Sequence, residues 1–290
     1  MAVPDNDNKW NLLQAKLNET KVTKAFEVFE DSGIEPVLIK GYASARFYPP
    51  EVGRAYVDVD LAVPPNEFQK AEELIKSTPL EGANIDLHKG FRHLDTVSWD
   101  RLFANTEVLE LNDTKIRLLC PEDHLRILCV HWLTDGGENK ERLWDIYYAV
   151  DRRPEEFSWE KCLGVVSENR QRWIKYTIGL AHKFLDLDIS DLPFKDEAKK
   201  LPGWLPVEVK KNWDANNPIV PLNHCLHDRK KLWKQIKKRI PPNPIFSTVY
   251  MDGDLDSRTR VFYQIGNFAT RFAAVIRTAI GKKFRSGKVK

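Results

Sequence analysis

The chain has 290 residues, of which 42% are hydrophobic and 30% charged, and its net charge is +3. This is the composition of a globular protein, and the length suggests two domains. We find no internal repeat, no low-complexity segment and no apolar run near the roughly 18 residues that cross a bilayer. The acidic, polar N-terminus does not resemble a signal peptide, and the four cysteines form no C-x-x-C pair. We therefore expect a cytoplasmic protein with free thiols and no transmembrane segment.

The first predicted elements are a helix and a short buried strand. Residues 1–8 are polar and expected to be disordered, and residues 10–29 carry an apolar stripe with helical spacing that ends near Gly33. Residues 37–39 are aliphatic and predict a strand. Gly41 follows, where the backbone can approach a ligand, and residues 42–48 predict a short helix whose first N–H groups favour an anion.

Residues 56–61 predict a second strand that carries two carboxylates. Their period of two places Asp58 and Asp60 on one face, with Val57, Val59 and Leu61 on the other. Two carboxylates held so close repel each other unless a cation lies between them, which favours a hard divalent ion such as Mg²⁺. Taken alone, the pattern fits an exposed edge strand better.

A series of short motifs in residues 9–151 changes that preference. In chain order they are Lys40-Gly41, Tyr48-Pro49, Arg54, Asp58-x-Asp60-Leu61, Ile85-Asp86-Leu87-His88, Pro121 to Leu125, Cys129 to His131 and Trp144-Asp145. Together they resemble the bacterial group of uncharacterised nucleotidyltransferases within the DNA polymerase β-type nucleotidyltransferase superfamily. In that superfamily the loop after the first strand usually reads Gly-Ser, whereas here it reads Lys-Gly, with Ser44 three residues later.

The resemblance implies a fold, a cofactor and site residues. The fold would be α+β, a polymerase β-like mixed sheet with helices, followed by a mainly helical C-terminal domain. Asp58, Asp60 and Asp86 would be the catalytic residues and would bind two Mg²⁺ ions, for which Mn²⁺ could substitute. Gly41 would cradle the triphosphate of an NTP such as ATP. Lys40 or Arg54 would be the cationic contact and Ser44 a further phosphate ligand, although Lys40 could instead pair with an aspartate.

Further strands complete the predicted nucleotidyltransferase domain, residues 9–120. Residues 66–76 predict a helix, and in residues 84–88 the alternation places Asp86 and His88 on one face. His88 could lie beside the substrate or be a structural histidine. Residues 107–111 and 115–119 predict two strands joined by a turn at Asn112-Asp113.

The rest of the chain predicts a helical domain over residues 121–280 and a flexible basic tail over 281–290. Pro121 begins the first helix, and prolines interrupt residues 187–245. Residues 227–240 predict a helix with Trp233, Ile236 and Ile240 on one side and basic residues on the other. A terminal amphipathic helix follows from Val261.

Charge is unevenly distributed along the chain. Residues 221–290 hold 16 Lys and Arg against 4 Asp and Glu, a net +12, which leaves −9 for residues 1–220 of a chain with net charge +3. Three explanations remain open for the basic region at 227–290. It could contact the acidic part of the chain, an anionic partner such as nucleic acid or a phosphate-bearing molecule, or an anionic membrane surface.

We expect a Mg²⁺-dependent enzyme that transfers NMP from an NTP to a hydroxyl-bearing acceptor and releases pyrophosphate. The acceptor could be a small molecule, a peptide, a protein or RNA. Two alternatives remain: a non-catalytic antitoxin-like or scaffold module, and an NTP-dependent kinase, which uses similar metal chemistry but transfers the γ-phosphate.

Overall fold

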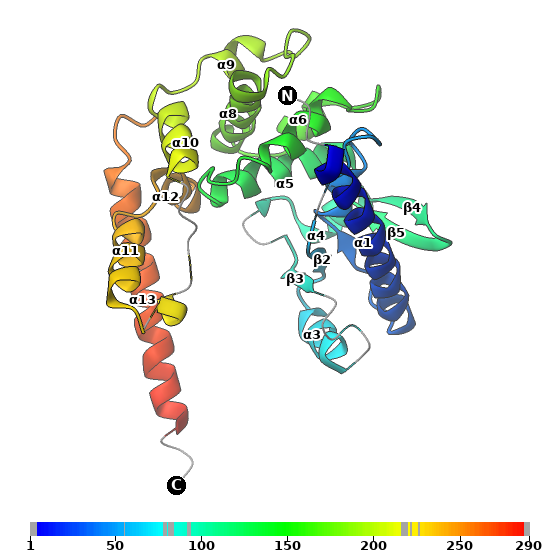
Figure 1. The fold of residues 1–290 in the computed structure, drawn as a ribbon, viewed down its shortest axis with the longest axis horizontal. Coiled ribbons are helices and arrows are strands. Elements are labelled where there is room, and N and C mark those ends of the chain that lie inside the picture. The colour runs from blue at the N-terminus through cyan, green and yellow to red at the C-terminus, as the bar shows by residue number, and fades with distance from the viewer. Residues whose placement is uncertain are drawn as a thin grey trace. The chain divides into compact units, whose positions relative to one another are not determined.

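The structure is a computed structural model that describes residues 5–54, 56–77, 80, 84–91, 94–215, 220, 222–225 and 227–286, without the side chains of 5–12, 222, 223, 238 and 274–286. The chain forms two compact units (Figure 1). Unit 1 comprises Met1–His131 and Glu141–Lys199, and unit 2 comprises Trp132–Lys140 and Lys200–Lys290. Within the described residues, no helix is long and apolar enough to cross a membrane.

Among the described residues of unit 1, five strands form one mixed sheet in the order β3-β2-β1-β5-β4. The strands are β1 (Val37–Leu38), β2 (Val59–Val63), β3 (Ile85–Lys89), β4 (Glu107–Leu111) and β5 (Thr114–Leu118). Strand β2 is antiparallel to β1 and parallel to β3, β1 is parallel to β5, and β4 is antiparallel to β5. The mixed α+β fold expected from the sequence is thus confirmed.

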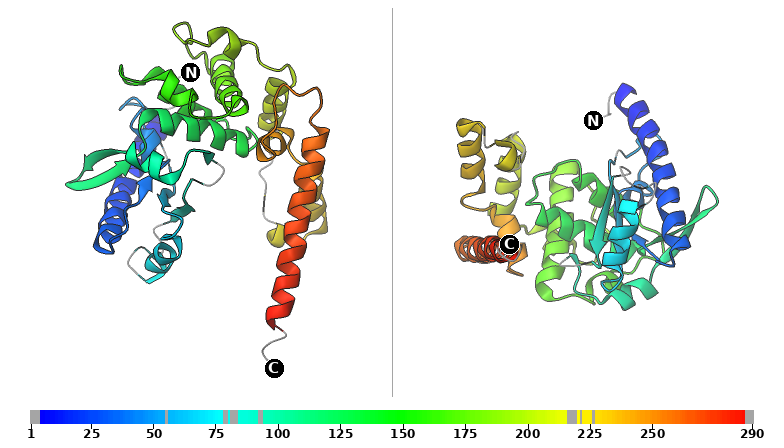
Figure 2. Two further views of the ribbon diagram at one scale, coloured as in Figure 1. Left: turned by 180° about the vertical axis from the view of Figure 1, so that it is seen from behind. Right: turned by 90° about the horizontal axis from the view of Figure 1, so that it is seen from below.

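The other described elements of unit 1 are helices. They are α1 (Asp5–Asp31), α2 (Tyr42–Ala45), α3 (Phe68–Ser77), α4 (Trp99–Ala104), α5 (Pro121–Thr134), α6 (Leu143–Asp151), α7 (Trp159–Leu163), α8 (Glu168–Leu185) and α9 (Lys195–Lys199). Helix α1 lies against the sheet (Figure 2). It begins at Asp5 and so includes residues 5–8 of the segment expected to be disordered, whereas residues 1–4 lie outside the described part.

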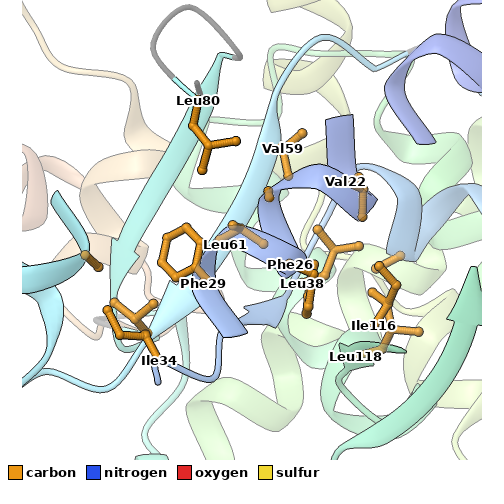
Figure 3. Packing of buried hydrophobic residues seen from close by; sticks show 14 residues of the cluster. Val22, Phe26, Phe29, Ile34, Leu38, Val59, Leu61, Leu80, Ile116 and Leu118 are labelled. Carbon is orange, nitrogen blue, oxygen red and sulfur yellow. The ribbon is translucent and has the colours of Figure 1, made fainter. Parts of the chain in front are cut away.

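Apolar side chains cover both faces of the sheet. On one face, Phe26 and Phe29 of α1 pack against Leu38, Leu61 and Leu118 (Figure 3). On the other face, a second cluster joins the sheet to residues of α4 and α5, and its fully buried members are Val37, Ile39, Ala62, Leu102 and Ile127. Strand β2 is therefore buried on both sides, which corrects the expectation of a half-exposed strand with Val57 on its buried face. Val57 precedes the strand and is exposed.

Unit 2 is helical in its described residues. It contains α10 (Trp204–Asp214), the short 3₁₀ helix η2 (Leu222–Cys225), α11 (Arg229–Arg239), α12 (Pro244–Tyr250) and α13 (Val261–Ser286). The Trp213 side chain donates to the carbonyl of Gly137 at 2.9 Å, and the Trp204 side chain donates to that of Leu255 at 3.0 Å. Helix α13 runs to Ser286, so it includes part of the tail expected to be flexible, and residues 287–290 lie outside the described part.

Candidate metal and nucleotide site

The register of two parallel strands brings the carboxylates of the candidate site together. Asp60 of β2 is paired with Asp86 of β3, and Ala62 is paired with His88. Because alternate residues of a strand share a face, Asp60, Asp86 and His88 project from the same face of the sheet. One ligand atom from each of these three side chains can be chosen so that all lie within 4.8 Å of one another.

His88 lies between the two carboxylates. Its Nε2 is 3.1 Å from Asp86 Oδ2 and 3.4 Å from Asp60 Oδ1. The hydrogen bond from His88 to Asp86 lowers the pKa of Asp86 to about 2, although the partial burial of Asp86 acts in the opposite direction. Burial alone would lower the pKa of His88, but its bonds to both carboxylates raise that pKa overall. The imidazole thus stabilises the ionised form of both aspartates.

Lys40 supplies a second compensating charge. Its Nζ lies 2.6 Å from Asp60 Oδ1, and both side chains are nearly buried. Burial would raise the pKa of Asp60, but the His88 bond and the Lys40 charge lower it overall. Of the two roles that the sequence left open for Lys40, the structure shows pairing with an aspartate.

Asp58 lies outside this group. It is exposed, and its Oδ1 accepts a hydrogen bond of 2.5 Å from Asn84 Nδ2. Asn84 and Asp58 stand just before the paired residues Ile85 and Val59, which explains why their side chains meet. Asn84 precedes β3 and has a positive φ of 58°, so strand alternation does not predict where its side chain lies, and its contact with Asp58 could not be read from the sequence.

Gly41 turns the chain from β1 into α2. Its φ of 60° and ψ of −112° are accessible essentially only to glycine. A Cβ on Gly41 would lie 3.2 Å from the Asp58 carbonyl oxygen and 3.3 Å from the Tyr56 ring. Gly41 therefore has a structural role in addition to any contact with phosphate. The amides of Ala43 and Ser44, at the start of α2, donate hydrogen bonds to the carbonyls of Lys40 and Gly41.

Arg54 and Ser44 support this turn in the structure. Arg54 forms a two-pronged ion pair with Asp145 of α6, with Nη2 2.7 Å from Oδ2, and its Nη1 lies 3.4 Å from the Gly41 carbonyl. Tyr48 Oη donates to the same carboxylate at 2.7 Å. Ser44 is buried, with Oγ 3.4 Å from His124 Nε2. That Arg54 and Ser44 contact phosphate stays a prediction.

His131, one turn before the end of α5, also belongs to the surroundings of the site. Its Nε2 accepts a hydrogen bond from Arg142 at 2.7 Å. Burial, together with the positive charges of Lys40 and Arg142, lowers the pKa of His131 to about 3, so its ring is neutral. No motif in the sequence pointed to Arg142, because it lies in the segment between α5 and α6.

The donor set fits a divalent metal ion. Two carboxylates and one imidazole form a mixed oxygen and nitrogen set; the oxygens suit Mg²⁺ or Mn²⁺, and the imidazole favours the transition metal of the two. An ion bound here would replace Lys40 and His88 as the main source of positive charge next to Asp60.

Comparison with known proteins identifies the family of the chain. The family described as uncharacterised nucleotidyltransferase matches residues 5–186. The chain belongs to this family. Most of the matched part of the chain lies in unit 1, and none of residues 187–290 is included.

No curated protein matches the sequence of the chain. Among solved structures, it is similar to an antigenic nucleotidyltransferase-like protein from Paracoccidioides brasiliensis, with a TM-score of 0.43 and 16% identity over 63% of this chain and 92% of that chain.

Proposed function

We propose that the protein transfers NMP from an NTP to a hydroxyl-bearing acceptor and releases pyrophosphate. The observation that carries this proposal is the pairing of Asp60 with Asp86 in the sheet of a nucleotidyltransferase family member. Clustered carboxylates repel each other unless cationic groups compensate them, as Lys40 and His88 do here, and a scaffold needs neither the carboxylates nor their compensation. A phosphoryl-transfer site needs the carboxylates, because it must hold cations next to the triphosphate.

Asp60, Asp86 and His88 are the proposed ligands of a divalent ion. Bound there, Mg²⁺ or Mn²⁺ would polarise the α-phosphate and neutralise charge on the attacking and leaving oxygens. Asp58 is the proposed further carboxylate for a second ion that accompanies the triphosphate. Its exposed carboxylate accepts a hydrogen bond from Asn84, and rotation of one side chain would release it.

Lys40 and the Gly41 turn are the proposed contacts of the triphosphate. When a metal ion compensates Asp60, the Lys40 ammonium becomes available to phosphate oxygens from a position next to the site. Arg54 then acts as a positioning residue, because it ties the Gly41 carbonyl to Asp145. Arg54 would thus hold the turn rigid, and the positive charge of Lys40 would remain available to the triphosphate.

Incubation with an NTP labelled at the α-phosphate, Mg²⁺ or Mn²⁺ and fractionated candidate acceptors tests this function. We expect label in a new acceptor adduct, together with pyrophosphate. An unlabelled acceptor together with labelled NDP and no pyrophosphate would identify a kinase instead, and no metal-dependent NTP consumption with any acceptor class would contradict an enzymatic role.

A further inference from the structure

Helix α13 contacts the rest of unit 2 through its polar side. Gln264 Nε2 donates to the carbonyl of Pro242 at 2.6 Å, and the Tyr263 hydroxyl lies 2.9 Å from Ser257 Oγ. Asn267 follows one turn later and is completely buried. These residues lie on one side of the helix, because 100° per residue separates Tyr263 and Asn267 by only about 40°.

The opposite side of α13 is apolar and exposed. Its large apolar side chains and their exposed fractions are Val261 53%, Phe262 75%, Ile265 61%, Phe268 45% and Phe272 58%. At 100° per residue these five positions form one stripe about 120° wide, the width of a helix face that normally packs into a core. The Phe268 and Phe272 rings stack with centroids 6.1 Å apart.

This orientation is the reverse of that of an ordinary amphipathic helix. Burying a phenylalanine typically stabilises a protein by about 1.5–3 kcal/mol, whereas burying an amide such as that of Asn267 costs free energy unless it is hydrogen-bonded. In the described residues neither Asn267 Nδ2 nor its Oδ1 has a hydrogen-bond partner. The helix therefore exposes its apolar face to solvent, although burial of that face would stabilise the protein more than burial of the polar face.

The charge of this segment indicates what covers the apolar face. Residues 257–290 contain nine Lys and Arg and no Asp or Glu. Pairing of the stripe with a second copy would bring two such segments together, which like-charge repulsion opposes. An anionic surface satisfies both the apolar face and the positive charge.

We propose that α13 is a membrane-surface helix that binds anionic lipid. It lies in the plane of the interface with Phe262, Ile265, Phe268 and Phe272 inserted between the head groups and the acyl chains, while its basic residues contact lipid phosphate and carboxylate groups. The stripe from Val261 to Phe272 extends about 17 Å along the helix axis. The inference is independent of the proposed catalytic function.

Nucleic acid fits these observations less well. A nucleic-acid backbone takes up positive charge, but Val261 and Ile265 within the stripe offer nothing to phosphate and no flat ring for a base. Lipid acyl chains, in contrast, make favourable apolar contacts with both the aliphatic and the aromatic side chains of the stripe.

Vesicle binding by the full chain tests the proposal. We expect the protein to co-sediment with phosphatidylcholine vesicles that contain phosphatidylserine, to bind pure phosphatidylcholine vesicles more weakly, and to lose affinity as salt increases. The double variant Phe268→Gln with Phe272→Gln should bind anionic vesicles at least about tenfold more weakly, because two inserted rings are lost.

The control variant is Leu13→Gln with Leu17→Gln on α1. It also removes two apolar side chains four residues apart, which are 54% and 59% exposed, from a helix outside the proposed surface. We expect it to bind anionic vesicles like the unmodified protein. Thermal melting of the α13 variant should be nearly unchanged, because its altered side chains are exposed.

Three results would overturn the proposal. If the α13 variant binds anionic vesicles as well as the unmodified protein does, the stripe does not insert. If the unmodified protein fails to bind and is a dimer that the α13 variant dissociates, a second copy covers the face. If it fails to bind and the variant melts at a much lower temperature, the face packs against the protein itself.

Discussion

Replacing Asp86 by Asn tests the candidate metal site with little effect on the fold. The Asp86 side chain is 55% exposed and pairs with His88, so the substitution changes charge at nearly constant shape. Loss of a metal ligand should reduce nucleotide turnover by about 10²–10³-fold, equivalent to the several kcal/mol that a bound ion supplies. Pyrophosphate release and thermal melting should be measured together.

The matched control for this prediction is Asp100→Asn. Asp100 is an exposed aspartate in the first turn of α4 and lies outside the group around Asp60. Turnover by this variant should be unchanged. Equal activity of the folded Asp86→Asn protein and the control would remove Asp86 from the site.

Asp60→Asn is the less specific test, because Asp60 has two partners. Its removal leaves the nearly buried Lys40 ammonium without a carboxylate, and breaking a buried pair in this way typically costs about 3–5 kcal/mol. We therefore expect Asp60→Asn to lose stability as well as activity.

His124 should make the folded state sensitive to acid. It is buried beside Ser44, and burial, with the charges of Arg46 and Arg54, lowers its pKa well below the ordinary value. A proton then binds the unfolded chain but not the folded one, so stability is complete above the unfolded pKa of about 6.5 and falls as pH decreases below it.

The substitution His124→Gln removes this titration. Between about pH 7.5 and about pH 5.5, the unmodified protein should lose up to about 1.4 kcal/mol of unfolding free energy per pH unit from this residue, and the variant should lose less. Denaturant unfolding at both pH values measures the difference. Parallel pH dependences for the two proteins would show that His124 is protonated in the folded state.

At the residue level, alternation along strands could be read from the sequence, but long-range partners could not. Asp86 and His88 were expected on one face, and the structure confirms this by the short contact between them. The pairing of Arg54 with Asp145 joins residues 91 positions apart, and no local pattern distinguishes it from a phosphate contact. Sequence patterns determine which face a side chain occupies, whereas the partner depends on tertiary packing.

At the level of elements, the Arg54–Asp145 pair fastens the turn before α2 to α6. Arg54→Met should destabilise unit 1 by about 3–5 kcal/mol, because it leaves the Asp145 carboxylate buried without its cation. Tyr48→Phe removes one of several hydrogen bonds to Asp145 and should cost about 1 kcal/mol. Denaturant unfolding of both variants gives the two values.

A double-mutant cycle separates the ion pair from general packing. Arg54→Met combined with Asp145→Leu should be more stable than the sum of the two single effects predicts, since no charge is left unpaired. Additive effects would show that the two residues stabilise unit 1 independently. Nucleotide affinity should fall in Arg54→Met more than in Tyr48→Phe if the turn positions the triphosphate.

The elements themselves were predictable to different degrees. The hairpin of β4 and β5 follows from Asn112-Asp113, both of which have the positive φ of a tight turn. Strand β2 was harder to place, because it is buried on both faces and its alternating aspartates suggested a half-exposed strand. The amphipathic pattern of α13 was evident, but the sequence could not show that its apolar side faces outward, since both orientations have the same periodicity.

At the scale of the whole molecule, α5 is part of the core beneath the sheet. Ile127 of this helix belongs to the same buried cluster as Val37, Ile39 and Ala62. The domain boundary expected at residues 120 and 121 therefore divides a continuous apolar cluster, and the two sides of that boundary can be tested as separate fragments.

The final prediction concerns fragments that end at residue 120 or at residue 199. The shorter fragment lacks α5, so Val37, Ile39 and Ala62, each fully buried in the complete chain, lose part of their cover. It also lacks Asp145, the partner of Arg54. Exposed apolar surface costs about 25 cal/mol per Å² and loss of one partner of a buried ion pair about 3–5 kcal/mol, against a total stability of about 5–15 kcal/mol. Residues 1–120 should aggregate, whereas residues 1–199 should melt cooperatively and retain metal-dependent nucleotide turnover. A soluble, cooperatively melting fragment of residues 1–120 would establish the sheet as a domain independent of α5.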